Sequence, residues 1–167
     1  MLTQTTLTDD SGAIFSDDQQ YRYRLWRQIG PVLSATCAYV LLNPSTADHE
    51  KNDPTVERCC RRAMKAGFGR VEILNIFAYR STDPSVLYTL DDPVGTENDA
   101  AIIEVVRDAE LVICGWGTHG KLLGRGQQVL ALLKNEGIRP FALAVNRDRS
   151  PCHPLYQKYS VIPVEFK

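Results

Sequence analysis

Hydrophobic residues are spaced along the chain in two patterns, one typical of β-strands and one typical of helices. Apolar and polar residues alternate between Ala13 and Trp26, which predicts two short strands or a hairpin. Longer, nearly continuous apolar runs indicate strands that are covered on both faces of a sheet. The sequence therefore predicts four such buried strands, at about 36–42, 71–75, 111–114 and 140–145.

Helical patterns lie between these runs. Asn52-Asp53-Pro54 is predicted to begin a helix, with a capping side chain followed by proline, and Gly67 is predicted to end it. Two more helices are predicted at about 96–109, capped by Thr96, and at about 122–135. Strands that alternate with such helices form right-handed βαβ units. We therefore expect an α/β three-layer sandwich with a central, mostly parallel four-stranded sheet and a small N-terminal hairpin.

The 167 residues are predicted to form a single domain, because no internal repeat, low-complexity tract or long linker divides them. Residues 1–12 are expected to be flexible. No apolar run approaches the roughly 18–20 residues that span a bilayer, and the first residues are polar and acidic rather than a secretion signal. The five cysteines include no C-x-x-C pair, so we expect reduced thiols in a cytoplasmic protein. A monomer without a membrane partner is expected.

Charge is unevenly distributed along the chain, although the net charge is −1. Residues 1–20 and 81–110 are acidic, whereas residues 55–80 and 111–153 each contain six basic and two acidic side chains. A phosphate backbone responds to local potential rather than to net charge. From charge alone, the basic segments are either phosphate-binding or ordinary solvated faces. The basic face of the first predicted helix comprises Arg58, Arg61, Arg62 and Lys65.

The loops that follow the four buried strands carry most of the side chains suited to chemistry. They supply three asparagines, two of the three histidines and a tryptophan. In open α/β sheets, ligands bind in the crevice outside the carboxyl ends of the parallel strands. We therefore expect four loops to gather at one edge of the sheet, namely 43–46, 75–80, 115–119 and 146–154.

Several well-known catalytic motifs are absent from the sequence. It has no G-x-x-x-x-G-K-[ST] phosphate loop and no G-x-S-x-G nucleophile elbow, which argues against P-loop ATPases and α/β-hydrolases. The cysteines and histidines lack zinc-ligand spacing, although Cys152-His153 with Cys59 or Cys60 stays open as a set brought together by folding. Neither a metal nor a cofactor is expected.

Five motifs stand out at these positions: Leu42-Asn-Pro-Ser-Thr-Ala-Asp48, Asp53-Pro-Thr55, Asn75-Ile-Phe-Ala-Tyr-Arg80, Asp92-Pro-Val-Gly-Thr-Glu-Asn-Asp99 and His153-Pro-Leu-Tyr156. They span nearly the whole chain and are specific in combination. Together they closely resemble a bacterial family that is catalogued as a domain of unknown function. This resemblance implies no activity.

Four landmarks occur in a particular order, namely Asn43-Pro44, Asn75, Trp116-Gly117 and His153-Pro154. This order is more distantly similar to the uracil-DNA glycosylase superfamily, whose members are α/β sandwiches that excise bases from DNA. The resemblance implies that Asn43 positions a water, Asn75 reads the pyrimidine edge and His153 stabilises the leaving base. Two departures are evident: Leu41 stands where the first motif has glycine, and the last motif is reduced to His-Pro-Leu-Tyr.

The chemistry of base excision fits these residue types. Negative charge collects on the departing base, where a histidine donor stabilises it, and a water must be held near the sugar carbon. Asn43 cannot act as a base, so Asp48 or Asp53 is an alternative source of negative charge. The flipped base needs an aromatic surface, for which the candidates are Phe77, Tyr79 and Trp116. The candidate phosphate ligands are Ser45, Thr46, Arg58, Arg61, Arg62, Lys121, Arg125, Arg147 and Arg149.

These observations give one principal hypothesis and two alternatives. The principal hypothesis is a monofunctional DNA glycosylase, a hydrolase that removes a damaged or modified base and leaves an abasic site, with hypermodified phage bases among the substrates considered. The alternatives are a non-catalytic nucleotide- or nucleic-acid-binding module on the same fold, and an N-glycosidase or transferase that acts on free nucleosides. Structural roles also stay open, with Asp53 as a helix cap and Trp116 as a core residue.

Overall fold

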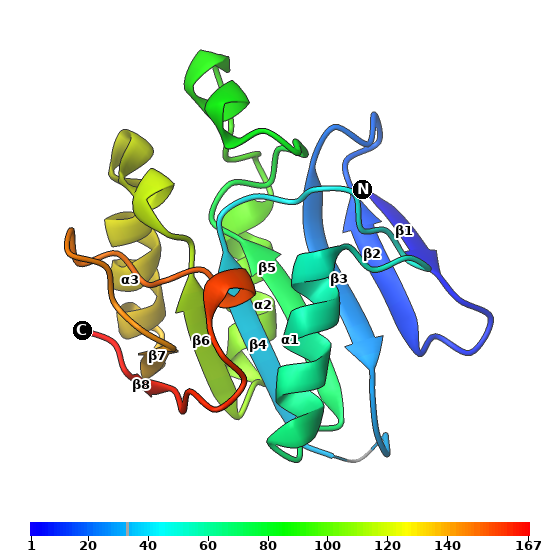
Figure 1. Ribbon diagram of the computed structural model, residues 1–167. Coiled ribbons are helices and arrows are strands. Elements are labelled where there is room, and N and C mark those ends of the chain that lie inside the picture. Colours follow the sequence, from blue (N-terminus) through cyan, green and yellow to red (C-terminus); the bar gives the residue numbers. More distant parts are fainter. Residues whose placement is uncertain (33) are drawn as a thin grey trace.

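The computed structural model describes residues 1–32 and 34–167, and one eight-stranded sheet forms its centre (Figure 1). The order of the strands across the sheet is β1-β2-β3-β5-β4-β6-β7-β8. Their bounds are β1 Leu2–Thr5, β2 Ser11–Phe15, β3 Arg22–Gln28, β4 Thr36–Leu41, β5 Arg70–Asn75, β6 Leu111–Gly115, β7 Pro140–Ala142 and β8 Val164–Glu165.

The middle of the sheet is parallel and both sides are antiparallel. Strands β5, β4, β6 and β7 are parallel neighbours, as the βαβ pattern predicted. On one side, β3 pairs antiparallel with β5 and continues through β2 to β1, and on the other side β8 pairs antiparallel with β7. The prediction of an α/β fold with parallel central strands is confirmed. The prediction of a four-stranded sheet with a separate hairpin is wrong, because Leu25 of β3 pairs with Ile73 of β5 and so joins the hairpin to the sheet.

In the described part of the chain, three α-helices cover the two faces of the sheet (Figure 1). Helix α1 (Pro54–Lys65) packs on one face, and helices α2 (Asn98–Arg107) and α3 (Arg125–Asn135) pack on the other. Side chains of β4 alternate between the two layers, so that Tyr39 packs with α1 and Val40 with α2 and α3. Burial on both faces explains the continuous apolar run of this strand.

Turns and caps place the helix ends, partly where the sequence predicted them. Asp53 Oδ1 accepts a 2.9 Å hydrogen bond from the Val56 amide at the start of α1, and Gly67 follows that helix with φ +89°. Helix α2 begins at Asn98 rather than at Thr96, because the buried Asn98 side chain is fixed by the backbone carbonyls of β5 and its exit. Helix α3 begins at residue 125 rather than 122, because Leu123 adopts φ +54°.

The N-terminal residues belong to the sheet. Residues 1–12, expected to be flexible, form β1, a turn and the start of β2. Trp26 Nε1 donates to the Asp9 carbonyl at 3.2 Å, and Ser11 Oγ donates to the His49 carbonyl at 2.8 Å. The first contact holds the turn between β1 and β2 against β3, and the second ties β2 to the loop that follows β4.

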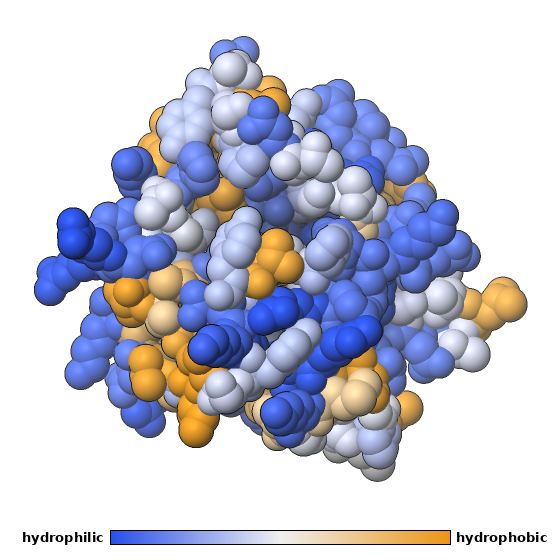
Figure 2. Space-filling model, viewed as in Figure 1, coloured by the Kyte–Doolittle hydropathy of each residue, from blue (hydrophilic) through white to orange (hydrophobic). Residues whose placement is uncertain are grey.

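The surface bears on where the protein can bind other molecules. No helix in the described part of the chain is long and apolar enough to cross a membrane. Hydrophobic residues gather at the lower left of the face in Figure 2, where Figure 1 draws β8 and the segment leading into it; Ile162 and Val164 are among the exposed residues there. All five cysteines are free thiols, and only Cys152 is not fully buried.

Candidate active site at the carboxyl ends of the parallel strands

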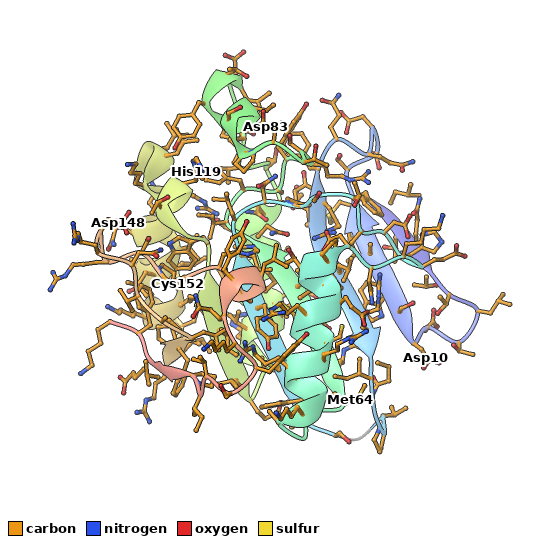
Figure 3. All side chains as sticks on the ribbon, in the orientation of Figure 1. Asp10, Met64, Asp83, His119, Asp148 and Cys152 are labelled. Atoms are coloured by element: carbon orange, nitrogen blue, oxygen red, sulfur yellow. The ribbon has the colours of Figure 1, made fainter. Side chains whose placement is uncertain are left out.

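A cavity of about 520 Å³ lies where the parallel strands end, a volume ordinary for a small-molecule site. Three of the four predicted loops contribute to its lining: those after β4, β6 and β7. His119 and Cys152, which both line it, lie near this end of the sheet in Figure 3. The lining residues also include Thr55 at the start of α1, Ser81, Thr82, Pro84, Tyr156 and Gln157.

Asn43 is held with its side-chain oxygen available. Its Nδ2 group donates to the carbonyl of Pro44 at 3.1 Å and to the carbonyl of Ser81 at 2.8 Å. Both amide protons are therefore used, which fixes the orientation of the side chain. No described residue donates to Oδ1, and Asn43 lines the cavity. The oxygen is thus a pre-oriented acceptor suited to a water or a ligand donor.

His153 offers the complementary donor. Its Nδ1 atom accepts from the Leu155 amide over 3.4 Å, a long contact, and this assigns the ring proton to Nε2. Burial lowers the pKa of His153, while the negative charge of Asp53 acts in the opposite direction with smaller effect. A lowered pKa keeps the imidazole neutral near pH 7. The cavity therefore contains a neutral histidine whose Nε2–H is a hydrogen-bond donor.

A third polar group is centred on Asn146, in the loop after β7. Its Nδ2 donates to Ser150 Oγ, and its Oδ1 accepts from Cys152 Sγ, both at 3.0 Å. These two contacts determine the orientation of the Asn146 amide. They leave one proton on Nδ2 and one lone pair on Oδ1 unused. Burial and the nearby Asp148 raise the pKa of Cys152, which keeps it a thiol donor. Asn146, which lines the cavity, therefore retains one donor and one acceptor.

The far wall of the cavity is joined to a neighbouring 3₁₀ segment. The hydroxyl oxygen of Tyr88, in the segment Pro84–Thr89, lies 3.1 Å from His119 Nδ1. The two rings meet edge to face with centroids 5.8 Å apart. This pair connects the loop after β6 with the acidic segment 81–110, so two loops that are distant in sequence bound the same space.

The two aspartates proposed as alternatives to Asn43 have structural partners. Asp53 is buried and caps α1, and neither aspartate lines the cavity. Burial acts to raise the pKa of Asp48, but hydrogen bonds from the Lys51 and Glu50 amides outweigh it, and the pKa is lowered. Asp48 therefore organises its own turn. Asp53 influences the site only through its charge near His153.

The residues nominated for base recognition are mostly outside the cavity. Asn75 is 2% exposed, and its Oδ1 accepts from Arg22 Nη2 at 3.2 Å beneath the loop after β4. Phe77 is fully buried in the core shared with α2 and α3. Tyr79 packs edge to face on Tyr21 instead. Trp116 alone of this group lines the cavity, with its ring otherwise buried.

The predicted phosphate ligands fall into two groups. Arg58, Arg62 and Arg125 are bound to backbone carbonyls within the fold, and the last also pairs with Asp99. Arg62 and Arg125 are buried, so both are structural residues here. Arg61 is exposed and pairs with Glu57 at 2.7 Å. Ser45 lines the cavity, and the other exposed residues of the set are Thr46, Lys121, Arg147 and Arg149.

From the sequence, no catalytic or recognition role was predicted for several residues of the cavity, chiefly Asn146, Cys152, Tyr156 and His119. Asn146 had the same signal as Asn43, an amide directly after a buried strand. Tyr156 is 79% exposed and its ring lies 5.9 Å from that of His153. The described residues contain no group of three or more His, Cys, Asp or Glu side chains placed to hold a metal ion.

Fold and cavity together define an α/β protein with a cavity lined in part by polar side chains at the carboxyl edge of its parallel strands. The chain belongs to the family described as "Protein of unknown function (DUF1643)", whose model matches residues 22–155. The matched range runs from the start of β3 to the turn that follows His153, and it includes Asn43 and Asn146. No curated protein and no solved structure matches the chain.

Proposed function

We propose that this protein is a DNA glycosylase that hydrolyses the N-glycosidic bond of a damaged or modified base. One observation carries the proposal: the free Oδ1 acceptor of Asn43 and the neutral Nε2–H donor of His153 belong to the same cavity. Breaking a C1′–N bond by water requires these two functions, an acceptor that holds the water and a donor that stabilises charge on the departing base.

The bond changes balance without any further reactant. The C1′–N bond breaks, and its electron pair moves onto the base. The water oxygen held by Asn43 bonds to C1′, and one proton of that water passes, directly or through solvent, to the base. His153 donates a hydrogen bond to a carbonyl oxygen of the base and keeps its proton. The products are an abasic sugar and the free base.

Base recognition in this proposal belongs to Asn146. Its amide is oriented by Ser150 and Cys152 and retains one donor and one acceptor, which suits the mixed hydrogen-bonding edge of a nucleobase. Asn75 is already engaged by Arg22, so it supports the loop that carries Asn43. Tyr156 has an exposed aromatic ring beside His153. A flipped base stacks on this ring.

A binding module without catalysis is the second candidate. It is favoured by one observation, namely that none of the described residues lining the cavity is an aspartate or a glutamate. Without a carboxylate, His119 and His153 are the general-base candidates of the lining, and the glycosylase proposal uses His153 as a donor instead. Binding of nucleic acid without base release would then account for the same polar groups.

The test is incubation with a panel of single-stranded and duplex oligonucleotides that carry natural, damaged and phage-type modified bases. Alkaline cleavage reveals abasic sites, and chromatography detects released base. We expect excision from at least one substrate, lost in Asn43→Ala and His153→Ala. Binding to the panel without base release would overturn the glycosylase and support the binding module. Release from free nucleosides alone would instead identify a nucleoside N-glycosidase.

A further inference from the structure

A small cavity of about 90 Å³ adjoins the candidate active site, and Trp116 and Thr118 line both cavities. It is formed mainly by the loop at 116–121, by the start of helix α3 and by the turn at 148–151. Figure 3 shows Asp148, from that turn, beside α3. The volume is below the roughly 300–1,000 Å³ of sites that enclose a whole small molecule, so this cavity suits one small group of a larger ligand.

Helix α3 begins at this cavity without a capping side chain. Its N-cap residue is Gly124, which has φ +65°, and its first turn contains no acidic residue. The Arg125 amide donates to carbonyls of the preceding segment, and the next two residues, Gly126 and Gln127, line the cavity. The first amide groups of a helix have no acceptor within the helix, and they give its N-terminus a partial positive charge. The start of α3 therefore favours an anion.

Trp116 supplies a second, independent donor at the same place. The residue is 4% exposed, its Nε1–H donates to no described residue, and the atom is not one of those that the protein encloses completely. A β-carbon would lie 2.8 Å from Nε1 at position 120 and 2.7 Å from it at position 126. Because both positions are glycines that line the cavity, the Nε1 edge of the ring borders this space. A buried tryptophan N–H usually has an acceptor, so the acceptor missing here is expected from a ligand.

Three charged side chains are in the described lining, namely Lys121, Arg149 and Asp148. The two basic ones are exposed, and neither forms an ion pair with a described residue. Asp148 Oδ1 accepts from the Ser150 hydroxyl at 2.6 Å and from the Ser150 amide at 3.1 Å. These hydrogen bonds lower the pKa of Asp148, which is therefore charged near pH 7. Two positive charges and one negative charge match a ligand of charge −1 better than one of charge −2.

Hydrogen bonds connect the walls of the two cavities. Ser150 Oγ, in the small cavity, accepts from Asn146 Nδ2 of the candidate active site at 3.0 Å. The Gly117 amide donates to the Pro151 carbonyl at 2.9 Å, which holds the loop after β6 against the turn at 148–151. A group bound in one cavity therefore lies next to a group bound in the other.

We propose that the small cavity binds the phosphodiester group beside the nucleotide whose base enters the candidate active site. The amide groups at the start of α3 and Trp116 Nε1–H donate to its unesterified oxygens, and Lys121 and Arg149 add attraction at the rim. A phosphodiester carries one negative charge, whereas a phosphate monoester has a charge of about −1.5 to −2 at pH 7. The inference rests on the proposed function, and it names the substrate class as a nucleic-acid strand rather than a free nucleotide.

The test is a titration of the full chain, followed by proton–nitrogen NMR of its two indole groups. The probe is the dinucleoside phosphate TpT, and we expect it to shift the Trp116 Nε1–H signal in a saturable way. Trp26 is the internal control, because its Nε1 already donates to the Asp9 carbonyl at 3.2 Å and its signal should not move. Trp116→Phe assigns the two signals.

Two comparison ligands identify the group that is bound. The uncharged methylphosphonate analogue of TpT should bind about tenfold more weakly, because hydrogen bonds to charged groups are about twice as strong as neutral ones. Thymidine monophosphate should also bind more weakly than TpT, because its phosphate carries more negative charge than the lining compensates.

Two single substitutions at the start of α3 test the location. Gln127→Glu places a carboxylate in the lining, where it repels a phosphate, although an acidic residue in the first turn is itself stabilising for a helix. We expect affinity for TpT to fall about tenfold without a loss of thermal stability. Gln128→Glu is the matched control, because Gln128 is exposed and lies outside the lining. It should change the affinity less than about twofold, since solvent and salt screen an exposed charge.

Three results would overturn the inference: an unmoved Trp116 signal, equal affinities for TpT and its methylphosphonate analogue, or equal affinities in wild type and Gln127→Glu. Tighter binding of thymidine monophosphate than of TpT would overturn it in favour of a free-nucleotide site. The inference and the proposed function fail separately. Binding of TpT without base excision from any substrate overturns only the glycosylase, and excision with an unmoved Trp116 signal overturns only the phosphodiester site.

Discussion

The Nη2 group of Arg22 donates to Asn75 Oδ1 at 3.2 Å, and both side chains are about 2% exposed. The same arginine donates through Nη1 to the Ala47 carbonyl at 3.0 Å. The end of β5 is thereby connected to the loop that carries Asn43. This connection gives Asn75 a structural role and removes it from direct contact with a ligand in the cavity.

Replacement of Asn75 by alanine is therefore expected to lower stability rather than change selectivity. The free energy of unfolding should fall by about 1–3 kcal/mol, because a donor of Arg22 is left buried and unpaired. Urea denaturation measures this, with Asn135→Ala on the exposed end of α3 as the control. A stable variant with an altered base preference would return Asn75 to the recognition site.

Asn43→Ala and His153→Ala are each expected to reduce base excision by about 10²-fold or more, since both groups act mainly in the transition state. Affinity for DNA should persist, because neither side chain carries a charge near pH 7. Single-turnover rates on the excised substrate, together with binding isotherms, separate the two effects. Wild-type rates in both variants would locate the chemistry elsewhere.

Asn146 and Cys152 are expected to set which base is recognised. Cys152→Ser keeps a donor to Asn146 Oδ1, whereas Cys152→Val removes it and frees the amide to rotate. Base preference on the oligonucleotide panel should be retained in the first variant and relaxed in the second. Asn146→Asp removes both amide donors and should abolish or redirect excision. An identical preference in all three variants contradicts this assignment.

His153 is expected to make stability depend on pH in the weakly acidic range. Its pKa is lowered in the folded state by burial, so the unfolded chain takes up the proton first as pH falls. The stability that the neutral ring contributes is complete above its ordinary pKa of 6.5 and is lost as pH falls through the lower folded-state pKa. His153→Gln should flatten the dependence of unfolding free energy on pH in this window. An equal slope in both proteins would show that another group is responsible.

Electrostatic contact with DNA is expected from exposed residues near the cavity rather than from the basic face of α1. The double substitution Lys121→Gln and Arg147→Gln should flatten the slope of log affinity against log salt by about one to two units. Lys134→Gln, near the C-terminal end of α3, should leave the slope unchanged. Equal slopes in wild type and the double variant would assign these two side chains to solvent.

The sequence predicted the parallel centre of the fold because β4, β5 and β6 are buried on both faces and are therefore mostly apolar. Edge strands lack that signal. β1 (Leu-Thr-Gln-Thr) and β8 (Val-Glu) are short and mostly exposed, so only the positions of their neighbours reveal them. Helix α1 was predicted because its cap is local, whereas the start of α2 depends on Asn98 reaching carbonyls more than 20 residues away.

The candidate site, like the fold, was predictable from the sequence only in part. Loops after strands were identified from chain order, and this located Asn43 and His153 in the cavity. Which polar side chain faces the ligand depends on tertiary partners that have no local pattern. Arg22 occupies Asn75, and the C-terminal carbonyls occupy Arg62. A helical wheel places Arg58, Arg61 and Arg62 on one basic face, but only the fold reveals that two of them hold the C-terminal segment.

The C-terminal segment holds the loop that carries His153 against helix α1. Arg58 donates to the carbonyls of Pro154 and Gln157, and Arg62 donates to three carbonyls between residues 157 and 161. A chain that ended at Tyr156 would lose most of these acceptors. The guanidinium groups of Arg58 and Arg62 would then lack most of their hydrogen-bond partners. The last eleven residues, of which Gln157 alone lines the cavity, would then determine how rigidly His153 is held at the site.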